Sequence, residues 1–304
     1  MAYADRPGGL SEFAKYGFAD LSGTVGKLDQ LVKLVGDSGR SAVAALALSP
    51  DPDQALNGLL DFAERDKSAV KKLLHKHEVA VRFCGVLGAS KALTDFLRRH
   101  PEYLETFEKQ HQIDLGPEHF RQAITKQVEP LLKSGFSTPD AWNALRKAYR
   151  AELLKIAIYD LSSPDAKNQL PVVAAALADI AGGAIEAGLA IARAELRFTN
   201  DHGIYSDLEI DATRLTVIAM GKCGARELNY ISDVDVIYVA ESGSPEVENH
   251  RAVEVATKLA TRMMRAMDGT ATEPDLWQVD PNLRPEGKSG ALVRTLESHI
   301  AYYD

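Results

Sequence analysis

The sequence GKCGARELNYISDVDV at residues 221–236 holds the features that decide the fold of this chain. It follows a β-rich run, Leu215–Met220, and leads into a second apolar run, Val234–Val239. Gly221 and Gly224 permit a tight turn between the runs, because glycine adopts backbone conformations that other residues avoid. The stretch therefore predicts a strand, a tight turn, a short helix over residues 223–230 and a second strand.

Asp233 and Asp235 stand two residues apart at the start of the second predicted strand. Residues at this spacing point to the same face of a strand, where two carboxylates repel each other unless a positive charge lies between them. A hard divalent cation with oxygen ligands is the natural partner of such a pair. Two exposed aspartates at a strand edge give the same pattern, so the interpretation needs support from the surrounding residues.

The surrounding residues favour a site for phosphate and metal. Consecutive N–H groups in a glycine turn can hold phosphate oxygens, and the N-terminus of the predicted helix 223–230 would favour an anion at the same place. Ser232 adds a hydroxyl beside the carboxylates, and Asp280 ends a third short strand predicted over Leu276–Asp280. Two acids at i and i+2, with a third from a neighbouring strand, are the ligand set of a two-metal phosphoryl-transfer site.

The rest of the sequence predicts an α+β fold: a helical N-terminal region followed by a module with a small mixed sheet. Helix signals recur through residues 1–200, among them Asp51 as a cap before Pro52 and Ser90 as a cap before an apolar stripe. Apolar residues spaced by three and four predict a further helix over 250–267. The small, polar stretch Ser134–Pro139 reads as a linker, which predicts an all-helical domain over 1–135 and a second domain over 136–304.

Composition narrows the class of protein. The chain has 304 residues, of which 45% are hydrophobic and 26% charged, as in folded globular proteins. Its two cysteines, Cys84 and Cys223, exclude a disulfide framework and suggest a reducing compartment. No apolar run approaches the roughly 20 residues of a membrane-spanning helix, and the N-terminus does not read as a signal peptide.

The net charge of −8 lies in the last third of the chain, where 10 Lys and Arg stand against 18 Asp and Glu. This balance argues against nonspecific nucleic-acid binding, which needs a basic surface. It is compatible with a solvated acidic surface and with a place that holds divalent cations.

The glycine turn, the Ser-Asp-x-Asp motif and the distant third aspartate resemble the DNA polymerase β-like nucleotidyltransferase superfamily. A closer resemblance is to the glutamine synthetase adenylyltransferase (glutamate–ammonia-ligase adenylyltransferase) family. Two stretches carry it, GKCGARELNYISDVDV and VDPNLRPEGKSGALVRTLESHIAYY at 279–303, and LRPEG within the second is the most specific part. The resemblance covers nearly the whole chain, with departures at Cys223, Ala225 and Asn282, where the family commonly has leucine, glycine and arginine.

The resemblance implies a function. Members of this family resemble two fused halves, of which one attaches AMP to a tyrosine of glutamine synthetase and the other removes it by phosphorolysis, releasing ADP. The helix-rich region before the sheet and the sequence ELN at 227–229 resemble the N-terminal, AMP-removing half of the family. This resemblance predicts deadenylylation. One copy of each motif, and an end within a helical pattern, predict that the chain is truncated.

The resemblance also implies ligands and partners. Asp233, Asp235 and Asp280 would be the catalytic residues and hold Mg²⁺ or Mn²⁺. The nucleotide and phosphate would be substrates, bound through Gly221, Lys222, Gly224, Ser232 and Arg284. The expected partners are glutamine synthetase and a PII-type nitrogen signal protein, with no nucleic acid and no membrane, in the cytoplasm.

Several residues and functions keep a second interpretation. Lys222 also reads as a surface lysine, and Arg284 as a structural bridge to a carboxylate. Glu286 would either orient Arg284 or be solvated. For the function, the alternatives are forward adenylyl transfer from ATP by the same site and a non-catalytic module that binds a nitrogen-sensing partner.

Overall fold

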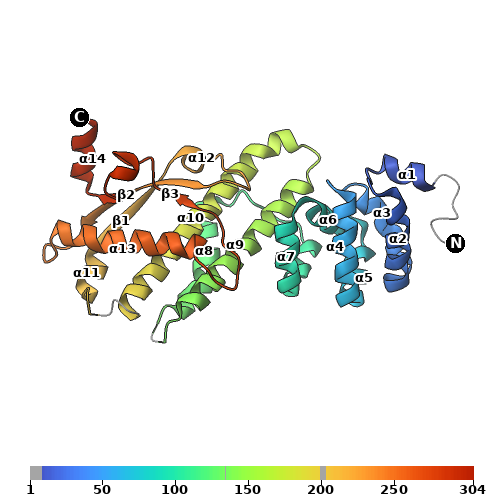
Figure 1. The fold of residues 1–304 in the computed structure, drawn as a ribbon, viewed down its shortest axis with the longest axis horizontal. Coiled ribbons are helices and arrows are strands. Elements are labelled where there is room, and N and C mark those ends of the chain that lie inside the picture. Colours follow the sequence, from blue (N-terminus) through green and yellow to red (C-terminus); the bar gives the residue numbers. More distant parts are fainter. Residues whose placement is uncertain (1–8, 134, 199–202) are drawn as a thin grey trace. The chain divides into compact units, whose positions relative to one another are not determined.

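The structure, a computed structural model, describes residues 9–133, 135–198 and 203–304. The chain divides into two compact units, each made of two stretches of sequence. Unit 1 consists of Met1–Gln112 and Leu154–Gln169, and unit 2 of Ile113–Leu153 and Leu170–Asp304. Figure 1 follows the elements in chain order. The domain boundary at residue 135 stays a prediction.

All described regular elements of unit 1 are helices. The caps predicted for two of its helices are confirmed: the Asp51 carboxylate accepts a hydrogen bond of 2.9 Å from the Gln54 N–H, and the Ser90 hydroxyl accepts one of 3.2 Å from the Leu93 N–H. Its elements are α1 (Gly9–Lys15), α2 (Leu21–Val35), α3 (Asp37–Leu46), α4 (Pro52–Arg65), α5 (Lys67–His75), α6 (His77–Ala89), α7 (Lys91–Arg99) and the 3-10 helix η2 (Pro101–Glu108).

Two long helices, α9 (Thr138–Leu161) and α10 (Ala166–Phe198), contribute sequence to both units. Thr138 and Pro139 already belong to α9, so this part of the predicted linker is helical, while Ser134 lies outside the described residues. By length and composition α10 could cross a membrane, but 72% of its most apolar window is buried within the chain, as in the core helix of a folded domain.

Unit 2 combines helices with a four-stranded mixed sheet, which confirms the predicted α+β class. Its helices are α8 (Gly116–Val128), η3 (Glu129–Leu131), α11 (Asp207–Ala212), α12 (Gly221–Gly224), α13 (Asn249–Asp268), η4 (Gly287–Ser289) and α14 (Leu296–Tyr303), with the unit-2 parts of α9 and α10. Its strands are β1 (Thr213–Ala219), β2 (Val234–Ser242), β3 (Val279–Asp280) and β4 (Val293–Arg294).

β2 is the central strand of the sheet. It pairs antiparallel with β1 along one edge and parallel with both β3 and β4. β3 pairs with the first two residues of β2 and β4 with Tyr238 and Val239 farther along. The third strand was predicted over 276–280 and has two residues, and β4 was not predicted, because two-residue strands carry almost no periodic signal.

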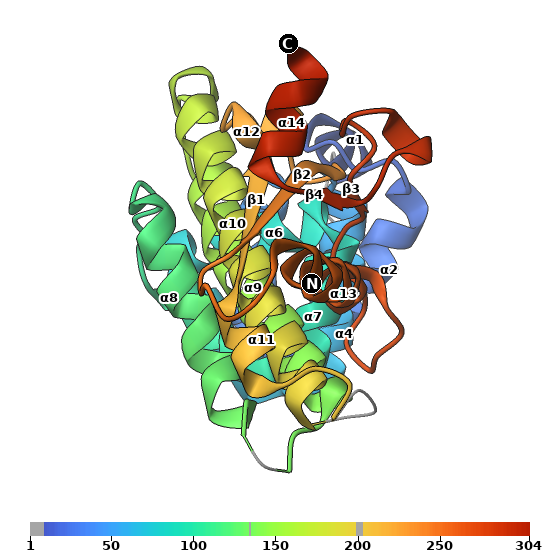
Figure 2. The same ribbon diagram turned by 90° about the vertical axis from the view of Figure 1, so that its left-hand side faces the viewer.

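Alternation along β2 separates a buried face from one that is buried only at Ile237. Val234, Val236, Tyr238 and Ala240 are buried, and α13 packs along this sheet. Asp235 lies on the other face and is half-buried. Figure 2 shows α8, α10, β1 and β2 side by side in that order. The helix predicted over 250–267 is confirmed as α13.

Two arginines of α9 hold the irregular segment between α13 and β3. Arg146 is fully buried, and its guanidinium donates hydrogen bonds of 2.6–3.1 Å to the carbonyls of Ala266, Gly269 and Glu273. Arg150 donates to the Asp275 carbonyl at 2.5 Å. The segment that leads into β3 is therefore anchored through its backbone.

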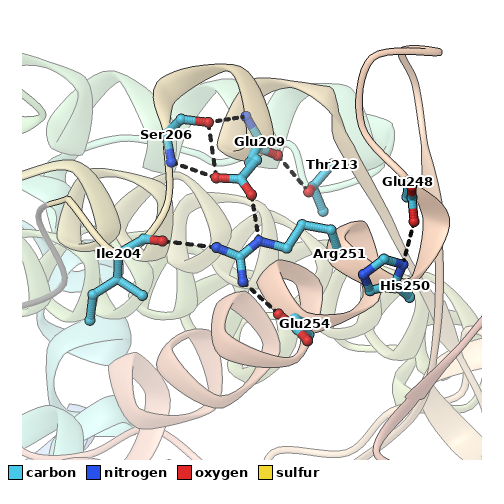
Figure 3. A network of polar contacts seen from close by, with 8 residues as sticks. All are labelled: Ile204, Ser206, Glu209, Thr213, Glu248, His250, Arg251 and Glu254. Carbon is cyan, nitrogen blue, oxygen red and sulfur yellow. Dashed lines mark hydrogen bonds and ion pairs between the residues drawn. The ribbon is translucent and has the colours of Figure 1, made fainter.

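A second polar cluster joins α11 to α13 (Figure 3). Ser206 and Glu209 form a reciprocal capping box at the start of α11. The Arg251 guanidinium donates to the Glu209 carboxylate, to the Ile204 carbonyl at 2.8 Å and to Glu254 at 2.7 Å. This cluster fixes the N-terminus of α13 against the turn that precedes β1.

We expect Arg146→Met to lower the free energy of unfolding by about 3–5 kcal/mol, since it strips buried carbonyls of their charged donor. Urea denaturation measures the change. Arg40→Met is the control, because Arg40 forms an exposed pair with Asp37, and such pairs contribute about 0–1 kcal/mol. Equal losses in the two variants would contradict an anchoring role for Arg146.

Stability should also depend on pH through Glu209. The Arg251 guanidinium and the Ser206 N–H lower the pKa of Glu209 to about 2. A carboxylate with a lowered pKa stabilises the fold above its unfolded pKa, and this stability is lost as pH falls towards the folded pKa. Because the pair reaches solvent, we expect Glu209→Gln to remove about 1–2 kcal/mol at pH 7. Melting curves between pH 7 and 2 should converge for wild type and variant, and a constant gap would refute the linkage.

Candidate active site

Three carboxylates meet at one end of the sheet. Oxygen atoms of Asp233, Asp235 and Asp280 all lie within 4.8 Å of one another. Asp235 and Asp280 are half-buried and Asp233 is exposed. Both the glycine-containing α12 and β3 lie at this end of β2 (Figure 1).

Strand register produces this convergence. Asp235 of β2 is the direct partner of Asp280 in the parallel pairing of β2 with β3, and directly paired residues put their side chains on the same face. The Val234 N–H donates to the Gln278 carbonyl at 3.0 Å, which holds the two strands in this register. Asp233 precedes Asp235 by two residues and so points to the same face.

The cluster is electrostatically unfavourable without a cation. Burial raises the pKa of Asp235, and the charges of Asp233 and Asp280 raise it further, while Lys222 opposes them. Three carboxylate groups at this separation are a hard-oxygen donor set suited to Mg²⁺ or Mn²⁺. The residues present therefore fit a divalent metal ion.

Gly221 and Gly224 are required by close backbone approaches. Gly221 has φ +52°, in the left-handed region, and a Cβ there would collide with the Asp235 carboxylate. A Cβ at Gly224 would collide with the Ala219 carbonyl at the end of β1. The turn therefore lies directly against the acidic cluster.

Part of the turn's backbone is already engaged. The Gly224 N–H donates to the Met220 carbonyl at 2.9 Å and the Ala225 N–H to the Gly221 carbonyl at 3.1 Å. In the first turn of a helix the leading N–H groups have no partner within the helix. The part of the turn that can donate to phosphate is therefore Gly221–Cys223, and Gly224 serves the close packing of the turn.

The helix predicted over 223–230 is wrong in length: α12 spans four residues, Gly221–Gly224. Arg226 adopts a left-handed conformation, φ +58°, that no helix continues through. Its guanidinium makes a bidentate contact with Asp179 of α10, 47 residues away, with Nη2 2.7 Å from Oδ2. Such a short helix adds little dipole, so anion binding here would rely on individual N–H groups and cations.

The other predicted phosphate-binding residues are placed as follows. Lys222 is exposed on the turn, near enough to Asp235 to lower its pKa. Ser232 is half-buried beside Asp233. Arg284 donates to the carbonyls of Pro281 at 2.8 Å and Gly290 at 3.2 Å, so it braces the loop after β3.

Of the two alternatives predicted for Glu286, the structure agrees with the solvated one. The residue is exposed, and its carboxylate pairs with Arg294 of β4 at 2.8 Å and not with Arg284. The structural alternative for Arg284 predicted a bridge to a carboxylate. Its guanidinium instead donates to backbone carbonyls of its own loop. In addition, the Asn282 N–H donates to the Asp280 carboxylate at 2.8 Å and so orients a member of the cluster.

The pairing of Asp179 with Arg226 beside the site was not predicted from the sequence. A signal existed, because Asp179 is an acid directly after the apolar run Val172–Ala178, and a charge within an apolar helix needs a partner. Its partner, 47 residues away, could not be read from local spacing. Both line a pocket of about 580 Å³ between α8, α10 and β1.

This geometry agrees with a comparison to protein families. The model of the glutamate–ammonia ligase adenylyltransferase family matches residues 80–304. The chain belongs to this family. The resemblance found in the sequence is thereby confirmed.

Relatives with the name bifunctional glutamine synthetase adenylyltransferase/adenylyl-removing enzyme match nearly the whole chain. The protein of Leifsonia xyli is 40% identical over 97% of this chain and 29% of its own length. That of Streptomyces coelicolor is 37% identical over 100% of this chain and 29% of its own length, and that of Mycobacterium avium is 40% identical over 85% and 24%. The chain thus spans less than a third of the length of these relatives.

We expect Mn²⁺ or Mg²⁺ to raise the melting temperature of the chain, because a cation relieves the repulsion among the three carboxylates. Asp235→Asn should melt at or above the wild-type temperature in a chelator, since the raised pKa of Asp235 means that its negative charge is less favourable in the folded chain than in the unfolded chain. The variant should also lose the stabilisation by metal. Thermal melts with and without metal measure both effects, and an equal metal response in the two proteins would disprove the site.

Proposed function

We propose that this chain removes AMP from the adenylylated tyrosine of glutamine synthetase by phosphorolysis, yielding ADP and unmodified glutamine synthetase. The observation that supports it most is the convergence of Asp233, Asp235 and Asp280 within 4.8 Å beside a glycine turn. The relatives' names, which include both adenylyltransferase and adenylyl-removing activity, supply the reaction class and the substrate.

In the proposed reaction an oxygen of inorganic phosphate attacks the phosphorus of the tyrosine-bound AMP. A P–O bond to phosphate forms, the P–O bond to tyrosine breaks, and the tyrosine oxygen leaves with the electron pair and takes up a proton. Such transfers need positioning and charge neutralisation more than covalent chemistry from the protein. A divalent ion, when bound, would neutralise developing negative charge on the phosphoryl oxygens.

The chain's own residues divide this work. Asp233, Asp235 and Asp280 would hold Mg²⁺ or Mn²⁺. The N–H groups of Gly221–Cys223 would donate to phosphate oxygens and Lys222 would add a positive charge, with Ser232 beside them. Arg284, braced by its own loop, would present its remaining N–H groups to a phosphate.

Forward transfer of AMP from ATP is the second candidate, because the relatives' names include that activity and both directions would use the same acids. A non-catalytic module that binds a PII-type partner is disfavoured by the intact acidic cluster. The two cysteines are free thiols, which supports our proposal of a cytoplasmic location.

We expect Asp235→Asn to reduce phosphorolysis by about 100-fold or more, because it removes a charge that would hold the metal. The assay measures ADP release from adenylylated glutamine synthetase with phosphate and Mg²⁺, using the whole protein that carries this chain. Because the assay contains no ATP, forward transfer of AMP cannot take place in it. A matched assay with ATP and unmodified glutamine synthetase decides between the two directions.

Glu241→Gln is the control for this variant. Glu241 is exposed on the same strand and the same face as Asp235, at the far end of β2. It should keep normal turnover. Near-normal turnover in folded Asp235→Asn would exclude Asp235 from the catalytic centre.

A further inference from the structure

Asp179 is a buried carboxylate in the apolar helix α10, with 7% of its surface exposed. A charge in such a place is costly unless it is paired and hydrogen-bonded. Both of its oxygens accept hydrogen bonds from Arg226, with Nε 3.2 Å from Oδ1 and Nη2 2.7 Å from Oδ2. The planar guanidinium matches the carboxylate, which fixes direction as well as distance.

Arg226 reaches Asp179 from the end of the glycine turn. Its left-handed conformation, φ +58°, is unfavourable for a residue with a long side chain. The Arg226 N–H donates to the Cys223 carbonyl at 3.1 Å and the Glu227 N–H to the Lys222 carbonyl at 2.8 Å. The backbone of Arg226 and Glu227 is therefore hydrogen-bonded to the turn. As a result, the contact between the Arg226 side chain and Asp179 fixes the turn to α10.

The acidic cluster is held by different means. Strand register places Asp235 and Asp280, and neither is in contact with the Asp179–Arg226 pair through a hydrogen bond of the described structure. The turn has two supports. At its start the Met220 N–H donates to the Asp235 carbonyl of the sheet at 2.8 Å, and at its end Arg226 binds α10. Only the second support depends on the Asp179–Arg226 pair.

We propose that Asp179 and Arg226 form a clamp that positions the turn Gly221–Gly224 for binding the phosphates of a nucleotide. They are positioning residues, and the inference rests on the proposed function in assigning phosphate binding to this turn. Loss of the clamp weakens nucleotide binding and leaves metal binding by the aspartates intact.

The test compares the variant Asp179→Leu/Arg226→Met with wild type. Removing both partners leaves no buried unpaired charge, whereas truncating Arg226 alone would leave the buried Asp179 carboxylate without its partner. Arg226→Lys keeps the charge but loses the bidentate fork. The matched control is Glu118→Gln/Arg121→Met, because that bidentate pair lines the same pocket but lies within α8.

Titrations of the 304-residue chain measure the affinity for Mn²⁺ alone and for ADP in saturating Mn²⁺, alongside thermal melts. We expect the clamp variant to bind ADP about tenfold more weakly, as for other losses of supporting contacts, with unchanged Mn²⁺ affinity. Arg226→Lys should fall between it and wild type, and the α8 control should match wild type. In the whole protein, the KM for phosphate in phosphorolysis should rise more than kcat falls.

Unchanged ADP affinity in a folded clamp variant would overturn the proposal. So would a parallel loss of Mn²⁺ and ADP affinity, which indicates a general disturbance of the site, or an equal loss in the α8 control. If the wild-type protein releases no ADP from adenylylated glutamine synthetase, the proposed function fails, while the titrations still decide whether the clamp positions the turn.

Discussion

The anchoring of the 269–278 segment by Arg146 is the contact on which the geometry of the site depends. This segment has no regular structure until β3 begins at Val279, yet it must deliver Asp280 opposite Asp235. A buried guanidinium that binds three carbonyls of one loop and helix end fixes the backbone at several points at once. A lysine could not replace it, because an ammonium group lacks the fork that spans separate acceptors.

With the segment fixed, a two-residue strand can position a carboxylate accurately. The pairing of β3 with β2 contributes little stability by itself, since it is so short. It serves to bring a third acid to two others that already share a face. Burial raises the pKa of Asp235, and repulsion from Asp233 and Asp280 raises it further. The rest of unit 2, including the buried face of β2 under α13, has to outweigh that repulsion when no cation is bound.

Local patterns allowed much of the fold to be predicted from sequence, because local contacts create them. Asp51 and Ser90 cap their helices through residues three positions away, and the shared face of Asp233 and Asp235 follows from strand alternation. The length of α12 could not be predicted, because Arg226 leaves the helix to meet a residue 47 positions earlier. The partners of Arg284 and Glu286 could not be predicted for a similar reason: they are loop carbonyls and a β4 arginine that motif spacing does not reveal.

The second support of the turn, which comes from α10 and not from the sheet, bears on how one site could serve both directions of AMP transfer. Transfer from ATP expels pyrophosphate and phosphorolysis takes up phosphate, so the two are different reactions, but both exchange the tyrosine oxygen and a phosphate oxygen at the same phosphorus. The proposed metal ligands would serve that phosphorus in either reaction, and strand register sets their geometry. What differs is the phosphate-bearing substrate, ATP in one direction and inorganic phosphate in the other. Under our proposals, the turn binds whichever of these substrates is present, and the contact of Arg226 with α10 helps to set its position. Direction could then change through the turn and its helix, while the acidic cluster stays constant.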